Sequence, residues 1–202
     1  MIITDTQRKS LVELIAIAFT RTAASLSTLV GAQVSVGTPK LRVLTLADAL
    51  ADLSEAGRPP DLAVTQRFSG VLAGTSVLAL DVQSAGLLVG LLTGESPATR
   101  LNEASREVLL EVGTSLLSAC VNTLSSVGGA RVSFAAPQFY HAAPELLARA
   151  VADGAPDLQL GMVMGTTLQV RGHTISARML IVISLATLDH IARGIAPVAV
   201  MQ

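Results

Sequence analysis

Aromatic residues and lysine are scarce in this sequence of 202 residues, and each shortage excludes a class of function. There is no Trp, one Tyr and four Phe, so stacking of nucleic-acid bases on aromatic side chains is not expected. Lys9 and Lys40 are the only lysines and the net charge is -1, which leaves no polybasic tract for phosphate backbones or anionic lipid. We therefore expect no nucleic-acid partner.

Long apolar runs and cysteine pairs are also missing. Uninterrupted apolar runs such as 85–92 are far shorter than the roughly 20 residues that a membrane-spanning helix needs. The first ten residues carry Asp5, Arg8 and Lys9 instead of the apolar centre of a signal peptide. Cys120 stands alone, so no disulfide within the chain is expected. Together these features predict a protein without a membrane span in a reducing cytoplasm.

Apolar residues are abundant, at 50% of the chain against 14% charged residues. This balance is typical of a folded protein and not of a disordered one. A chain of this length can form one domain or two small halves that share a core. With so few aromatic residues, the core must be built from Leu, Val, Ile and Ala.

A long amphipathic helix is predicted over residues 103–129. Oxygen-bearing side chains lie along one side of it, at spacings of three and four residues: Glu111, Thr114, Ser115, Ser118, Asn122 and Ser125. The apolar residues of the opposite side predict its core face: Leu109, Val112, Leu116, Cys120 and Leu124. The helix therefore has one buried face and one face of small polar residues.

The same pattern occurs earlier in the chain, shifted by 98 residues. The shift superposes six identical residues without a gap: Glu13 on Glu111, Leu26 on Leu124, Gly31 on Gly129, Val34 on Val132, Ser35 on Ser133 and Pro39 on Pro137. We interpret the chain as a single domain with an internal repeat, 1–97 and 98–202, related by a pseudo-two-fold axis. Two independent domains are disfavoured because each half has only about 100 residues and the connection at 94–99 is short.

Each half is predicted to contain a long helix, an extended segment, a short helix, a hairpin and a further helix. In the first half these are the helix 4–30, the extended segment 33–44, the helix 45–55, the strands 62–72 and 76–81 around a turn at 73–75, and the helix 84–92. Gly31, Gly57 and Gly94 are expected to end the helices. The predicted fold is α/β of the α+β kind, with long helices packed on a mainly antiparallel sheet.

One spaced pattern in both halves resembles a known family. Glu-x-x-(Asn)-x22-Pro, set on the long helix and followed by Gly and a Val-rich strand, is similar to the motif of the CheC, CheX and FliY group of chemotaxis phosphatases. Glu13 to Pro39 and Glu111 to Pro137 have its spacing, and Gly113 continues the second copy in the family manner. The resemblance covers nearly the whole chain and implies a single CheC-like domain.

The resemblance also implies a partner and a reaction. Members of the family dock the motif helix on a phosphorylated receiver domain such as CheY. The Glu contacts a Lys of the receiver, and the Asn orients a water molecule for attack on the aspartyl phosphate. Magnesium belongs to the receiver in this chemistry, so no cofactor or metal is expected here. His141, His173 and His190 lie in separate segments without the spacing of metal ligands.

The sequence departs from the family at the Asn position of both halves. Ala16 replaces the first Asn, and Thr114 replaces the second. An Ala side chain cannot orient water, so we expect the first site to be inactive. Lys9 and Glu107 occupy the position four residues before each Glu, where the family has an acidic residue or Ser, which again favours the second copy.

The predicted site therefore lies on the second helix. Glu111 and Thr114 are the candidate catalytic residues. Candidate binding residues are the remaining polar positions around them and the first Glu: Glu107, Ser115, Ser118, Asn122 and Glu13.

Two hypotheses remain open for Thr114. Its hydroxyl has one donor and two acceptor lone pairs, so it can hold a water molecule, and Glu-x-x-Thr resembles the phosphatase motif of many sensor histidine kinases. Hydrolysis is then retained at the second motif. Alternatively, the chain is a non-catalytic adaptor that docks through Glu111 on a receiver, a CheD-like deamidase or a flagellar-switch component. The oligomeric state stays open.

Overall fold

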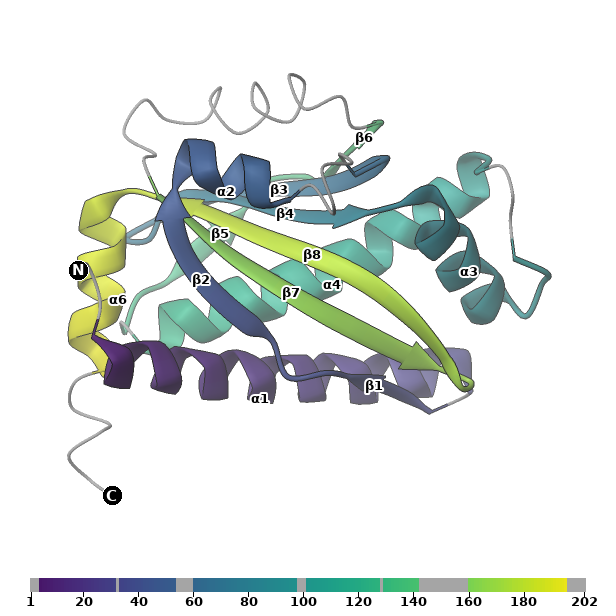
Figure 1. Cartoon of the computed structure of the whole chain (residues 1–202), viewed down its shortest axis with the longest axis horizontal. Helices are drawn as coiled ribbons and strands as arrows, with labels where there is room; N and C mark the ends of the chain where they lie inside the picture. Colours follow the sequence, from purple (N-terminus) through teal and green to yellow (C-terminus); the bar gives the residue numbers. More distant parts are fainter. Residues whose placement is uncertain are drawn as a thin grey trace.

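The computed structural model describes residues 4–31, 33–53, 60–97, 101–127, 129–141 and 160–195. In chain order the elements are α1 (Asp5–Val30), β1 (Val34–Val36), β2 (Lys40–Thr45), α2 (Leu46–Asp52), β3 (Leu62–Gly70), β4 (Gly74–Leu80), α3 (Val82–Thr93), α4 (Glu103–Val127), β5 (Val132–Phe134), β6 (Gln138–His141), β7 (Leu160–Val170), β8 (His173–Ile183) and α6 (Leu185–Ile195). The strands form one curled sheet with helices on both faces (Figure 1). The predicted α+β fold is confirmed.

The two halves of the sequence complete each other's part of the sheet. The strand order is β1-β7-β8-β4-β3-β5, β2 also pairs with β7, β6 also pairs with β3, and every pairing is antiparallel. Thus β1 and β2 of the first half pair with β7 of the second, and β5 and β6 of the second half pair with β3 of the first. The hairpin β3–β4 therefore needs β5 and β6 of the second half to complete its pairing, and the hairpin β7–β8 needs β1 and β2 of the first half.

The long helices α1 and α4 lie on one face of the sheet and run in opposite directions (Figure 1). Their apolar sides form the main core with that face, and the predicted core residues of α4 are all buried, from Leu109 to Leu124. In α1 the residues 15, 18, 19, 22 and 26 are buried. Cys120 is fully buried in this core, as its place on the apolar side of the helix predicted, and the burial raises the pKa of its thiol.

A smaller core lies on the opposite face of the sheet, under α2. Ala49 of this helix and Leu53 at its C-cap pack on outward-facing strand residues: Ala63, Val77, Ala79, Val163, Leu180 and Val182. The helices α3 and α6 lie at the two ends of the α1–α4 pair (Figure 1). Gln7 Nε2 donates to the Ala192 carbonyl at 3.0 Å and joins the start of α1 to α6.

Most predicted helix ends are confirmed by their capping groups. Thr4 and Gln7 form a capping box at the start of α1, and Gly31 ends it in the left-handed conformation. Thr45 caps α2, whose described part ends at Asp52; residue 55, the predicted end, and Gly57 lie outside the described residues. Gly94 ends α3 as predicted.

The turn predicted at 73–75 is wrong. The strand β3 ends at Gly70, residues 71–73 connect the strands, and Gly74 already belongs to β4. A Cβ at Gly74 would lie 2.2 Å from the Val182 carbonyl oxygen of the neighbouring strand. This glycine therefore serves close strand packing, which its sequence neighbours do not reveal. Similarly, α3 begins at Val82 and not at Ser84, because Asp81 is its N-cap.

Two described helices are long and apolar enough to cross a membrane by length and composition alone: 5–28 of α1, and α4. Within the fold, 41% of the first apolar window and 50% of the second are buried. Core helices pass the same test, and α1 and α4 carry the main core.

Candidate functional site

The second motif lies on α4 at a point where the helix packs closely on β3. Asn102 starts this helix, because its side-chain oxygen accepts hydrogen bonds from the backbone amide and the hydroxyl of Ser105 at 2.8 and 2.9 Å. At Gly113, an added Cβ would lie 2.9 Å from the Val64 side chain of β3. Since Gly113 faces the sheet, Glu111 is directed to the exposed side of the helix.

Acidic and polar side chains of the motif are exposed on α4. Glu111, Glu107, Ser115 and Asn122 are all exposed. Among the described residues, neither Glu107 nor Glu111 forms an ion pair. Both carboxylates are therefore accessible to a cationic group of another molecule.

Thr114 has an unusual environment. Its hydroxyl oxygen is buried and has no hydrogen-bond partner. Hydroxyls of five other helical threonines donate to the carbonyl four residues before them: Thr20, Thr22, Thr28, Thr93 and Thr123. An unsatisfied buried hydroxyl costs roughly 1–3 kcal/mol, so Thr114 would gain from any group that reaches it.

The predicted polar stripe is not uniformly exposed. Ser118 is half-buried, and its hydroxyl donates to Oε1 of Gln66 on β3 at 3.1 Å. Ser125 is buried, and its hydroxyl donates to the Asn122 carbonyl at 2.9 Å. Thus the stripe has an exposed part around Glu111 and Ser115 and a part that faces the sheet.

Gln66 is the site residue that sequence reasoning missed. It is 4% exposed, and its Nε2 donates to the Ala135 carbonyl at 3.3 Å while its Oε1 accepts from Ser118. The available signal was an amide in the middle of the predicted strand 62–72. A buried amide needs hydrogen-bond partners, but its position in the strand does not say which segments provide them.

The first motif has a different surface. Glu13 is exposed, as are Thr20 and Ala24, and Ala16 is half-buried. Ile17 is 51% exposed, between these residues. Glu13 and Glu111 each lie in the first half of their helix, and α1 and α4 run in opposite directions (Figure 1). The structure therefore does not bring the two glutamates together in one site.

An open groove separates α1 from α4 beside the second motif. Its volume is about 550 Å³, and its lining consists mostly of small residues: Ala18, Arg21, Thr22, Ser115, Ser118, Ala119, Asn122, Thr123 and Ser126. Ser115, Ser118 and Asn122 of the predicted binding set lie here. The groove supplies a shallow, largely uncharged surface in which Arg21 is the cation.

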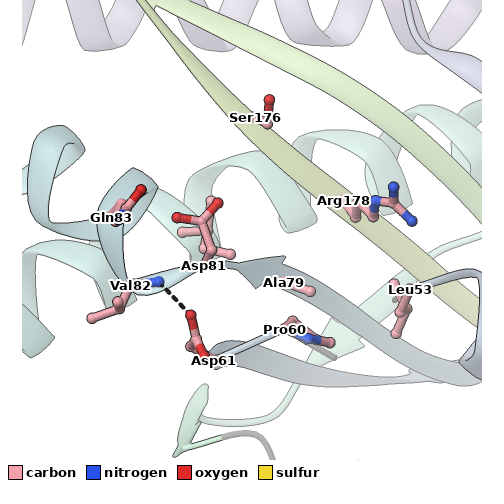
Figure 2. Close-up of a pocket in the computed structure, with 10 residues that line it drawn as sticks. Leu53, Pro60, Asp61, Ala79, Asp81, Val82, Gln83, Ser176 and Arg178 are labelled. Atoms are coloured by element: carbon pink, nitrogen blue, oxygen red, sulfur yellow. Dashed lines mark hydrogen bonds between the residues drawn. The ribbon is translucent and has the colours of Figure 1, made fainter. Parts of the chain in front are cut away.

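A separate pocket of about 240 Å³ lies near the start of α3 (Figure 2). Asp61 accepts a hydrogen bond from the Val82 amide at 2.9 Å, and Asp81 accepts from the Ser84 amide at 2.6 Å. Arg178 donates to the Asp52 carbonyl at the end of α2. These polar groups hold the end of α2 and the start of α3.

Among the described residues, no three His, Cys, Asp or Glu side chains gather as they would around a metal ion. His141 packs its ring edge-on against Phe139, with 5.5 Å between the ring centroids.

Comparisons with known proteins place this geometry in a known fold. No sequence-family model matches the chain, and no curated protein matches it. Among solved structures, FliY of Thermotoga maritima is 19% identical, with 98% of this chain and 99% of that chain covered and a TM-score of 0.76. FliM in the FliG–FliM complex of H. pylori is 13% identical, with 95% and 100% covered and a TM-score of 0.66.

A third similar structure is the CheX–CheY–BeF3–Mg²⁺ complex of Borrelia burgdorferi. The matching chain of that structure is 16% identical, with 83% of this chain and 96% of that chain covered and a TM-score of 0.51. At such identities the similarity is one of fold, and it agrees with the resemblance carried by the Glu-x-x-(Asn)-x22-Pro spacing. The chain therefore has the fold shared by the structural neighbours FliY, FliM and CheX.

Proposed function

We propose that the chain acts in chemotaxis or flagellar-switch signalling by docking a phosphorylated receiver domain on the exposed face of α4. Glu111 is the primary docking residue, and Glu107, Ser115 and Asn122 extend the contact. The exposed, unpaired carboxylate of Glu111 one helical turn from Thr114 carries this proposal. Support comes from the shared fold, since the CheX neighbour was solved in complex with CheY.

The chemistry at an aspartyl phosphate sets what the second motif must do. A water oxygen attacks phosphorus, the bond between phosphorus and the aspartate oxygen breaks, and the products are aspartate and inorganic phosphate. Most of the catalytic gain comes from holding that water in line with the leaving oxygen. A hydroxyl can do this by accepting one hydrogen bond and donating another.

Thr114 must turn its hydroxyl outward to take part in this reaction. The buried oxygen cannot touch solvent in the present conformation. A rotation about the Cα–Cβ bond moves a threonine hydroxyl between staggered positions, and an unpartnered hydroxyl loses no protein hydrogen bond in the process. In this proposal, receiver docking is coupled to that rotation, and Thr114 then holds the attacking water.

Docking without hydrolysis is the second candidate, and the burial of the Thr114 hydroxyl favours it. In that case Glu111 binds a receiver or a flagellar-switch component, or a CheD-like protein, while the phosphate lifetime stays unchanged. The small uncharged surface of the α1–α4 groove suits an adaptor as well as a phosphatase.

Decay of a phosphorylated cognate receiver separates the two candidates. We expect excess protein to shorten the phosphate lifetime, and Thr114→Ala to remove the effect without weakening binding. An unchanged lifetime with measurable binding would leave the adaptor function only. Absence of binding to the receiver, in both its free and beryllium-fluoride-loaded forms, would refute the proposal.

A further inference from the structure

Gln66 joins three segments that are distant in sequence. It lies on β3 and contacts Ser118 of α4 through Oε1 and the Ala135 carbonyl through Nε2. Ala135 belongs to the connection 135–137 between β5 and β6, which ends in the motif residue Pro137. The Ala135 amide in turn donates to the Arg67 carbonyl at 3.0 Å. One buried side chain therefore links the motif helix, the sheet and the motif proline.

The backbone at this place is repeated in the other half, and the residue that matches Ser118 donates to a different acceptor. The Gly37 amide donates to the Thr167 carbonyl at 2.8 Å, as the Ala135 amide does to Arg67. By this correspondence Thr166 stands in the place of Gln66, and Thr20 in the place of Ser118. The Thr20 hydroxyl donates to Ala16 of its own helix at 2.9 Å. Thus the Ser118 hydroxyl of α4 donates to the sheet, whereas the Thr20 hydroxyl of α1 donates to its own helix.

The Ser118 hydroxyl has two possible hydrogen-bond acceptors, one on the sheet and one on its own helix. A helical serine can donate to the carbonyl four residues before it, and this bond bends the helix slightly. Ser27 does so, donating to the Ala23 carbonyl at 2.7 Å. For Ser118 the corresponding carbonyl is that of Thr114. Instead, Gln66 accepts the hydrogen bond from the Ser118 hydroxyl. The turn 114–118 is therefore tied to the sheet, and Ser118 makes no hydrogen bond to the carbonyl of Thr114.

We propose that Gln66 is a positioning residue that holds the turn 114–118 of α4 and the connection 135–137 in one arrangement for receiver docking. Gln66 is buried and touches no receiver; it acts through Ser118 and Ala135. The docking part of this inference rests on the proposed function, whereas the structural part concerns the free protein.

Amide hydrogen exchange tests the structural part. Gln66→Met keeps a side chain of similar length without its hydrogen-bonding groups, and we expect exchange at 114–118 and 135–136 to speed up by about fivefold, the value of one ordinary hydrogen bond. Exchange at 16–20 of α1 should not change. Ser76→Ala is the matched control, because its hydroxyl donates to the backbone oxygen of Gln66 at 2.9 Å and not to the side chain. Unchanged exchange at 114–118 in Gln66→Met would overturn the proposal.

Binding to a receiver loaded with beryllium fluoride and magnesium tests the docking part, with all variants fully folded. We expect Gln66→Met and Ser118→Ala each to raise the dissociation constant by about fivefold, and the double variant to be no weaker than either one. Faster exchange with an unchanged dissociation constant would reduce Gln66 to a purely structural residue and overturn the docking part. If the wild-type protein binds no receiver, the proposed function fails, while hydrogen exchange still decides the structural part.

Discussion

The helices α1 and α4 occupy equivalent places in the two halves and share the motif Glu, yet they differ at the two positions that end the Glu-x-x-Asn pattern. At the position directly before Ala16 and Thr114, α1 has Ile15 and α4 has Gly113. The missing side chain of Gly113 lets α4 pack closely on β3. At the next position, Thr114 carries a hydroxyl and Ala16 does not. The comparison shows that the fold accepts either residue at each of these positions. The Thr114 hydroxyl is therefore not required for packing.

The largest expected effect concerns the core side of this comparison. Ile15→Ala should lower the free energy of unfolding by about 2–5 kcal/mol, because it leaves a cavity in the main core. Gly113→Ala should lower it by about 1–3 kcal/mol through overpacking against Val64. Urea denaturation measures both. A neutral Gly113→Ala would contradict the close approach of α4 to β3.

Restoring the family Asn tests the functional side. Thr114→Asn should shorten the receiver's phosphate lifetime by a factor on the order of a hundred relative to wild type, because a longer amide can reach the attacking water without burial. Ala16→Asn creates the same motif on α1, and we expect a gain below about tenfold, since Lys9 replaces the acidic residue there. Phosphate-decay kinetics give both rates. Equal gains at the two sites would remove the functional difference between the halves.

Removing each glutamate compares the two docking surfaces. Glu111→Ala should weaken receiver binding by about tenfold, as expected for the loss of one hydrogen bond to a charged group. Glu13→Ala should change the dissociation constant by less than about twofold, the lower end for a solvent-exposed ion pair. Titration calorimetry at fixed ionic strength measures these values. A larger loss at Glu13 would move the site to α1.

The smallest expected effect concerns the hydroxyl of Thr114. Thr114→Val should raise the free energy of unfolding by about 1 kcal/mol, because it replaces a buried unsatisfied hydroxyl with a methyl group of similar size. The matched control is Thr22→Val, which removes a buried hydroxyl that donates to Ala18 and should be destabilising. Thermal or urea unfolding checks both signs. A destabilising Thr114→Val would show that this hydroxyl has a partner in solution.

Local sequence patterns predicted the elements well where their causes are local. The capping box of Thr4, the N-cap Thr45 and the terminal Gly31 and Gly94 act within one helical turn, so their signals lie within a few residues. The predicted hairpin is present, but its turn was misplaced for the opposite reason. Residue 74 must be glycine because the backbone of Val182, more than 100 residues later, leaves no room for a Cβ. Nothing near Gly74 in the sequence distinguishes this packing role from a role in a turn.

For the site, the sequence by itself determined the spacing of Glu111 and Thr114 on one face of a helix, the weaker copy at Glu13, and the apolar side that packs into the core. These follow from the 3.6-residue period, which any window of the sequence contains. Only the tertiary structure decided that strands of each half pair with the other half, that Gln66 reaches Ser118, and that the hydroxyl of Thr114 is buried. Those features depend on which distant segments meet, and hydrogen bonds between such segments form only once the sheet has brought them together.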